Sequence, residues 1–339
     1  MSIFNLPPEL IDLVIRLDID VDTLRSCALV CRAFLQPSQR YLFATVDLGT
    51  PHGPVPRFHD LLRNSPHLCA HVRELAIVHL DYRGQWQAWY PSLAAVLDLL
   101  PNVTMFTLSF LPHVKWGDLP ANVQAAICAL CQRSPLVNLR VDGAGTINSV
   151  TEFSQLVASP ALKLLSLKDL DIPVAGPDEI PPTHRIALTD LVLDSNSPTL
   201  AIITPWLVDG GSLSQTISIS CNCTPETVSH SHALTHAAAA TLESVTLHSR
   251  ETALTTPVRL GGPQQKLHKV IVLLVVDVNH FNRLAQWLAV LLDSCPRSLR
   301  LFHVAVYLSA RDPNLPVGEP DWASVAELFV YMDELSTPG

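Results

Sequence analysis

The fold is decided by the stretch Leu162-Lys163-Leu164-Leu165-Ser166-Leu167, whose Leu-x-x-Leu-x-Leu pattern recurs along most of the chain. Apolar residues at alternate positions near its end are typical of a β-strand that buries one face. The pattern returns as Leu188-x-x-Leu191-x-Leu193, so the central residues Leu165 and Leu191 are 26 residues apart. A pattern repeated at a steady period indicates a chain built from stacked copies of one small unit.

Further copies of the pattern lie on both sides of this stretch. They are Val72-x-x-Leu75-x-Ile77, Val103-x-x-Phe106-x-Leu108, Leu136-x-x-Leu139-x-Val141, Leu242-x-x-Val245-x-Leu247, Leu267-x-x-Val270-x-Val272 and Leu299-x-x-Phe302-x-Val304, with a weaker copy in Ile217-x-Ile219. The central residues of successive copies are 25 to 33 residues apart. Apolar stripes with helical spacing separate the copies, as in Leu93, Val96, Leu97 and Leu100. Each copy therefore predicts one strand and one helix.

These spacings resemble those of leucine-rich repeats, whose period is about 20–29 residues. A strand and a helix cannot bury both their faces alone, so neighbouring units have to stack. We therefore predict an α/β fold for residues 48–339. The expected architecture is an irregular leucine-rich-repeat-like solenoid of about nine units, with parallel strands on the concave side and helices outside. The asparagine or cysteine that regular repeats place after each strand is missing, and a helix at 321–335 is expected to cap the last unit.

Local signals predict the limits of several elements. Ser149-Val150-Thr151-Glu152 fits a capping box, and Thr224-Pro225 fits an N-cap followed by proline at the first helical position. Thr45-Val46-Asp47-Leu48 is expected to form the first strand. Three prolines and two glycines between Gly49 and Pro56 predict a linker. Proline-rich loops are expected at 176–184 and 309–320.

A different pattern precedes the repeats, beginning with Leu6-Pro7-Pro8-Glu9-Leu10. Prolines suit the first turn of a helix, where a missing N–H costs nothing. One expected buried face of this helix consists of Leu10, Leu13, Val14 and Leu17, and Ile11 and Ile15 add apolar surface on an adjoining face. A unit of about 40 residues buries little surface, so spare apolar surface on it indicates a partner. Asp22 is the expected N-cap of the second helix.

Residues 1–47 resemble an F-box, most closely those of mushroom-type fungi. The residues that carry the resemblance are Leu6, Pro7, Glu9 and Leu10, then Leu24, Cys27, Val30, Cys31, Arg32 and Phe34, and finally Tyr41-Leu42-Phe43. Phe34 stands where the family most often has tryptophan, and the link between the first two helices is one residue shorter. The resemblance implies a short unit of three helices.

An F-box is the module by which substrate receptors dock on the Skp-family adaptor of cullin-type ubiquitin ligases. The resemblance implies that the chain is a substrate-recognition subunit of such an SCF ligase, with the repeats holding an unidentified target protein. The residues it assigns to adaptor docking are Leu6, Pro7, Leu10, Ile11, Ile15, Leu24, Val30, Cys31, Phe34 and Tyr41. An F-box-like scaffold without a role in degradation remains open as the alternative. An enzyme acting through the repeats has no motif in its favour.

Composition narrows the classes of partner. The formal net charge of −9 argues against a nucleic-acid-binding protein, which would show a basic face. The most hydrophobic run, Val270 to Val276, is far too short to span a bilayer, so no membrane partner is expected. The start of the chain lacks the pattern of a signal peptide, and eight cysteines are too dilute for a disulfide framework. We therefore expect a cytoplasmic or nuclear location with reduced thiols.

No catalytic motif, cofactor site or metal site is expected. Phosphate-binding glycine loops, H-E-x-x-H and G-x-S-x-G are absent from the sequence. Cys128-Ala129-Leu130-Cys131 has C-x-x-C spacing but lies in an apolar helical stripe, where thiols behave as core residues. The most metal-like group comprises Cys221, Cys223, His230, His232 and His236. Its spacing matches no zinc pattern, and a solvated polar segment is the alternative.

Two groups of residues are candidates for binding the target. Trp86, Trp89 and Tyr90 follow a strand motif in a polar-flanked insertion, where large aromatic residues can form a recognition hot spot. The alternative is a loop folded back on the edge of the array. Residues that follow the strand motifs should line one rim, and these are Asp142, Lys168, Asp169, Asp194, Ser195, His248 and Arg250.

Overall fold

The computed structural model describes residues 7–16, 20–49, 54–80, 86–111, 114–147, 149–172, 186–249, 260, 266–277, 282–296 and 298–309. The chain divides into two compact units, residues 1–162 and 163–339. Each unit combines parallel strands with helices, so the predicted α/β class and the parallel strands are confirmed. The expected cap at 321–335, the loop at 176–184 and residues 310–320 lie outside the described residues.

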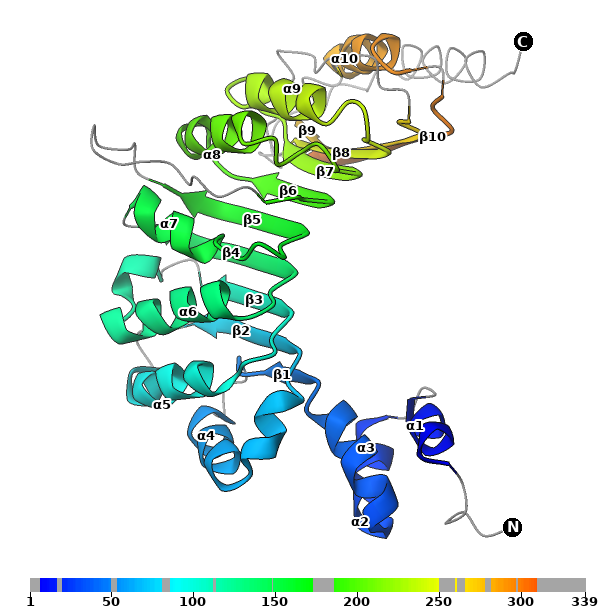
Figure 1. Cartoon of the computed structure of the whole chain (residues 1–339). Coiled ribbons are helices and arrows are strands. Elements are labelled where there is room, and N and C mark those ends of the chain that lie inside the picture. The colour runs from blue at the N-terminus through cyan, green and yellow to red at the C-terminus, as the bar shows by residue number, and fades with distance from the viewer. Residues whose placement is uncertain are drawn as a thin grey trace. The chain divides into compact units, whose positions relative to one another are not determined.

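The first unit begins with three helices and continues with alternating strands and helices. Its initial helices are α1 (Pro8–Arg16), α2 (Val21–Val30) and α3 (Arg32–Leu42). The later elements are β1 (Thr45–Asp47), α4 (Pro54–Asn64), η2 (Pro66–Ala70), β2 (Glu74–Leu80), α5 (Trp86–Leu99), β3 (Met105–Phe110), η3 (Trp116–Asp118), α6 (Ala121–Arg133), β4 (Asn138–Thr146) and α7 (Val150–Leu156). Helices α4 to α7 lie on one side of strands β1 to β4 (Figure 1).

The second unit repeats this alternation without a helical start. Its elements are β5 (Leu164–Asp171), β6 (Asp190–Asp194), α8 (Ser197–Asp209), β7 (Ser218–Asn222), α9 (Val228–Ala237), β8 (Ser244–Ser249), β9 (Lys269–Asp277), α10 (Asn282–Asp293) and β10 (Leu301–Ser309). The central and last apolar residues of each full Leu-x-x-Leu-x-Leu copy lie on a strand, because the alternating apolar residues supply the buried face that a half-covered strand needs.

The copies of the pattern stack in register. In the first unit Leu75 of β2 pairs with Phe106 of β3, which pairs with Leu139 of β4. In the second unit the paired central residues are Leu165, Leu191, Ile219, Val245, Val270 and Phe302. The partner of Leu191 is thus Ile219 and not Ile217, which precedes β7 and is 42% exposed. The weaker copy is therefore shifted by two residues from its predicted position.

Strands β3, β6, β7 and β8 each have a covered face and an open face. On β3, Phe106 and Leu108 are fully buried, while Thr107 and Ser109, which alternate with them, are partly exposed. Strands β6, β7 and β8 show the same alternation. Since side chains alternate between the two faces of a strand, the helices cover one face and leave the polar one accessible.

Polar contacts join successive strand–helix copies within each unit. The carbonyl of Thr189, just before β6, accepts hydrogen bonds from the N–H groups of Ile217 and Ser218 in the next copy, at 2.8 and 3.1 Å. The same double contact starts β2, β3, β4, β8, β9 and β10. Buried hydroxyls add further links, because Thr216 Oγ1 donates to the Leu188 carbonyl at 3.0 Å and Ser159 Oγ to that of Leu136 at 2.8 Å.

Three predicted element limits are corrected. Helix α4 begins at Pro54, inside the expected linker, because proline is compatible with a first helical turn. Helix α9 begins at Val228, and Thr224 instead forms a turn in which its N–H donates to Thr227 Oγ1 at 2.8 Å. The second helix is capped by Asp20 and not by Asp22, as described below.

The predicted capping box at α7 is confirmed in one of its two halves. Ser149 caps the helix, since its Oγ accepts from the Glu152 N–H at 3.1 Å. The Glu152 carboxylate accepts a hydrogen bond from Trp116 Nε1 at 2.9 Å. Trp116 is fully buried, so the glutamate satisfies an indole N–H that would otherwise be costly to bury.

Candidate interaction surfaces

The three initial helices enclose a small core of their own. Its buried residues are Ile11, Ile15, Leu24 and Phe34, which are 5%, 2%, 7% and 9% exposed. Cys27, Cys31, Tyr41 and Leu42 pack against it while staying partly exposed. Four of the residues assigned to adaptor docking are therefore the interior of the helical unit. A partner could reach them only if this core opened.

The burial of α1 is the reverse of the expected arrangement. Leu10, Leu13 and Val14 are 45%, 50% and 49% exposed, although their spacing predicted a buried face. Ile11 and Ile15 face α3 and the core instead. Both stripes have helical spacing, and only the packing of α2 and α3 selects between them.

An apolar surface remains exposed on α1 and α2. It consists of Leu10, Leu13 and Val14 on α1 together with Val21, Leu29 and Val30 on α2, and we call it the α1–α2 surface. Leu29 is 87% exposed and Val30 69%. Of the other residues predicted to dock, Pro7 is exposed and Leu6 lies outside the described residues. Sequence analysis missed Leu29, although its place beside Val30 at the end of α2 was visible.

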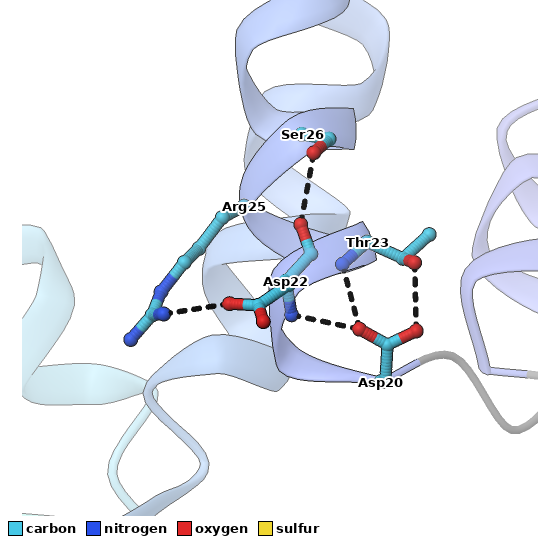
Figure 2. Close-up of polar contacts among 5 residues, drawn as sticks. All are labelled: Asp20, Asp22, Thr23, Arg25 and Ser26. Atoms are coloured by element: carbon cyan, nitrogen blue, oxygen red, sulfur yellow. Dashed lines mark hydrogen bonds and ion pairs between the residues drawn. The ribbon is translucent and has the colours of Figure 1, made fainter.

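Polar contacts fix the start of α2 beside this surface (Figure 2). Asp20 Oδ1 accepts from the N–H groups of Asp22 and Thr23, both at 2.9 Å, and Asp20 Oδ2 accepts from the Thr23 hydroxyl at 2.7 Å. The backbone N–H of Thr23 is the main cause that holds the pKa of Asp20 below its ordinary value, with the Thr23 hydroxyl next. Asp22 lies in the first turn and forms an ion pair with Arg25 at 2.8 Å.

The aromatic group predicted to bind the target belongs to a helix. Trp86, Trp89 and Tyr90 form the first turns of α5 and not a loop. Tyr90 is 5% exposed and so is a core residue, whereas Trp89 is partly exposed. The side chain of Trp86 is outside the described part of the chain. The segment is therefore helical and not a loop, and a role of Trp86 and Trp89 in target binding stays a prediction.

In the second unit, the strand register sets residues predicted to line one rim at equivalent positions of β5, β6 and β8. Asp169 and Asp194 line the same pocket in the second unit, and Ser195 lines it from a buried position. Lys168 pairs in register with Asp194 on the neighbouring strand. His248 is on β8, where its Nε2 is 2.8 Å from Ser220 Oγ. Asp142 is exposed on β4 of the first unit, and Arg250 lies outside the described residues.

The cysteine and histidine groups have the surroundings of structural residues. Burial raises the pKa of the Cys128 thiol to about 11, with the Glu152 carboxylate as a smaller cause, and burial also raises that of Cys131. Cys221 and Cys223 are buried, whereas His232 and His236 are exposed on α9. Among the described residues, no three His, Cys, Asp or Glu side chains are grouped as metal ligands would be.

Comparison with known proteins adds no indication of function to these surfaces. No protein-family model matches the chain, and no curated protein matches it. Within the described ranges, no helix combines the length and apolar character needed to cross a bilayer.

Proposed function

We propose that the chain is a substrate-recognition subunit of an SCF-type cullin ubiquitin ligase. Helices α1 to α3 would be its F-box and would dock on a Skp-family adaptor, and through it on the cullin. The strand–helix copies would be an irregular leucine-rich-repeat-like array that binds the target protein. The α1–α2 surface is the observation that carries this proposal, because it coincides with the stretch that resembles an F-box.

The physical case for a partner on these helices rests on where their apolar area lies. A small helical unit needs its apolar side chains for its own core, yet three on α1 and three on α2 are more than a third exposed. Burial of apolar surface stabilises by about 25 cal/mol per Å². Covering six such side chains therefore supplies a substantial driving force for association. Several exposed large apolar side chains on one small unit commonly mark a protein interface.

A subunit of this kind acts by proximity and performs no bond-breaking step. Binding the adaptor and the target on one chain turns the meeting of target and ubiquitin-charged enzyme into an effectively intramolecular event, which raises effective concentration. Such ligases act in the cytoplasm and the nucleus, and the proposal places the chain there. The reduced state expected of its eight cysteines agrees with that location.

The test is capture of a Skp-family adaptor by the full-length chain. Leu10→Asp/Val30→Asp places two charges on the α1–α2 surface without touching the helical core. We expect adaptor capture to fall more than about tenfold, since a buried unpaired charge is costly. Leu61→Asp is the matched control, because Leu61 is 38% exposed on helix α4, away from α1 and α2, and should leave capture unchanged.

Two outcomes would contradict the proposal. Failure of the unmodified chain to capture the adaptor would remove the F-box assignment. Equal capture by Leu10→Asp/Val30→Asp would remove the α1–α2 surface as the docking face. If the adaptor binds but target levels in cells do not respond to loss of the chain, the scaffold without a role in degradation is the better description.

A further inference from the structure

A pocket of about 400 Å³ opens at the carboxyl ends of strands β5, β6 and β7 in the second unit. It lies between the ends of these strands and the starts of α8 and α9. The lining residues that matter here are Asp169, Asp171, Asp194, Ser195, Asn222 and Glu226. Its size is in the range of pockets that hold small ligands or single side chains.

The lining offers hydrogen-bond acceptors and formal negative charge. Three aspartates and Glu226 contribute four carboxylates, and none of the described residues that line the pocket is Lys, Arg or His. The Asp171 carboxylate accepts from Asn196 Nδ2 at 3.1 Å, which holds it at the start of α8. The Ser197 hydroxyl donates to the Glu226 carbonyl at 3.2 Å and joins the two loops of the wall. These two hydrogen bonds connect the segments that form the wall of the pocket.

Two buried polar atoms in the lining have no hydrogen-bond partner within the described part of the chain. They are Ser195 Oγ and Asn222 Oδ1. Ser195 is only 5% exposed, and a buried polar group without a partner costs about 1–3 kcal/mol. Asn222 Oδ1 can only accept a hydrogen bond, so a ligand that satisfies it has to bring an N–H or O–H donor. This observation points to a donor-rich ligand independently of the charges.

The partial positive charges of the helix N-termini near the pocket do not cancel the negative charge of its lining. Each helix N-terminus carries about half a positive charge, so α8 and α9 together offer about one against four carboxylates. The N-terminus of α8 is also capped by its own chain, since Asn196 Oδ1 accepts from the Thr199 N–H at 3.0 Å. Among the described residues, no three His, Cys, Asp or Glu side chains are placed close enough together to hold a metal ion. This favours an extended cation over a metal ion as the ligand.

We propose that this pocket receives an arginine side chain of the target protein. A planar guanidinium carries five N–H donors in a fixed fork, which suits several acceptors spread around one pocket better than a compact ammonium does. The assignment rests on the proposed function in one respect: the arginine belongs to the protein that the ligase presents for modification. Recognition then consists of an arginine held by the carboxylates and the Asn222 side chain.

The experiment measures binding of a fluorescent peptide, Gly-Gly-Arg-Arg-Gly-Gly, to the full-length chain. Peptides with citrulline or lysine in place of arginine are the matched probes, because citrulline keeps the shape and loses the charge. The variant is Asp169→Asn/Glu226→Gln, which removes two charges at nearly constant size. Asn suits position 169 because its φ is 47°, a conformation that Asn tolerates. Asp60→Asn is the control, because Asp60 is exposed on α4 in the first unit.

We expect the arginine peptide to bind best and to lose about tenfold in affinity in Asp169→Asn/Glu226→Gln, with no change in Asp60→Asn. Equal binding of the citrulline peptide, or no loss in the double variant, would overturn the proposal. Equal binding of agmatine, a free guanidinium compound, would overturn the assignment to a protein side chain. The double variant should capture the adaptor normally, so a failure here is distinguishable from a failure of adaptor docking.

Discussion

At the scale of single residues, small differences in position decide which acidic side chain has a structural role. Asp20 immediately precedes α2 and Asp22 lies in its first turn. Aspartate is a favourable residue for capping a helix, so both were candidates. Asp20 does so because its backbone is extended, with φ −64° and ψ 163°, which directs its carboxylate back to two N–H groups. Asp22 is already helical and is left with an exposed ion pair to Arg25, of the kind that contributes little.

This difference predicts a pH effect confined to Asp20. Its folded-state pKa is lowered from 3.8, so its contribution to stability is complete above that value and is lost as the pH falls through the lower folded pKa. Asp20→Asn keeps a capping side chain but should remove this part of the acid dependence of the urea midpoint. Asp20→Ala should lower the midpoint at neutral pH, and Asp22→Asn should change it little. Equal effects of the two positions would contradict the assigned cap.

At the scale of elements, each strand–helix copy is joined to the next through backbone and hydroxyl contacts. Within each unit, a carbonyl before one strand accepts two N–H groups at the start of the next strand, so the spacing of the strands is maintained even where the number of residues between them varies. Buried hydroxyls such as those of Thr216 and Ser159 then satisfy carbonyls of the copy before. The variable period is tolerated because the extra residues lie between the strands and not within these contacts.

The hydroxyl contacts predict a specific loss of stability. Thr216→Val keeps the shape of a fully buried side chain but leaves the Leu188 carbonyl without the Thr216 hydroxyl. We expect the free energy of unfolding to fall by about 1–3 kcal/mol. Thr246→Val is the control, because Thr246 lies on the partly exposed face of β8 and should cost less than about 0.5 kcal/mol. Urea unfolding of both variants measures the difference, and equal losses would show that the buried contact contributes nothing.

At the scale of the whole molecule, burial is uneven between the initial helices and the strand–helix copies. The copies bury many side chains completely, including Trp116, Phe106 and Phe153. The initial helices leave the apolar residues of their own core between 2% and 9% exposed. This contrast is expected of a short helical unit, because a small unit buries a smaller share of its surface.

The same contrast predicts which thiols react in the native chain. Cys27 and Cys31 are partly exposed and should be alkylated by iodoacetamide at about pH 8. Cys128 and Cys131 should react far more slowly, because both are buried and burial raises the pKa of Cys128 to about 11. Mass spectrometry of the alkylated peptides measures the order, and all eight cysteines should react in denaturant. Rapid native labelling of Cys128 would contradict the burial of α6.

The sequence by itself determined the strands, their parallel arrangement and the small helical unit before them. It could do so because alternating apolar residues and a steady period are local properties, as in Leu165, Leu191 and Val245. Only the tertiary structure decided which stripe of α1 is buried, since Ile11 and Leu10 are equally apolar and the packing of α2 and α3 chooses between them. The sequence placed Asp169 and Asp194 on one expected rim, but only the tertiary structure added Asn222 and Glu226 and formed a pocket there, because register between copies and the course of the loops are not local properties.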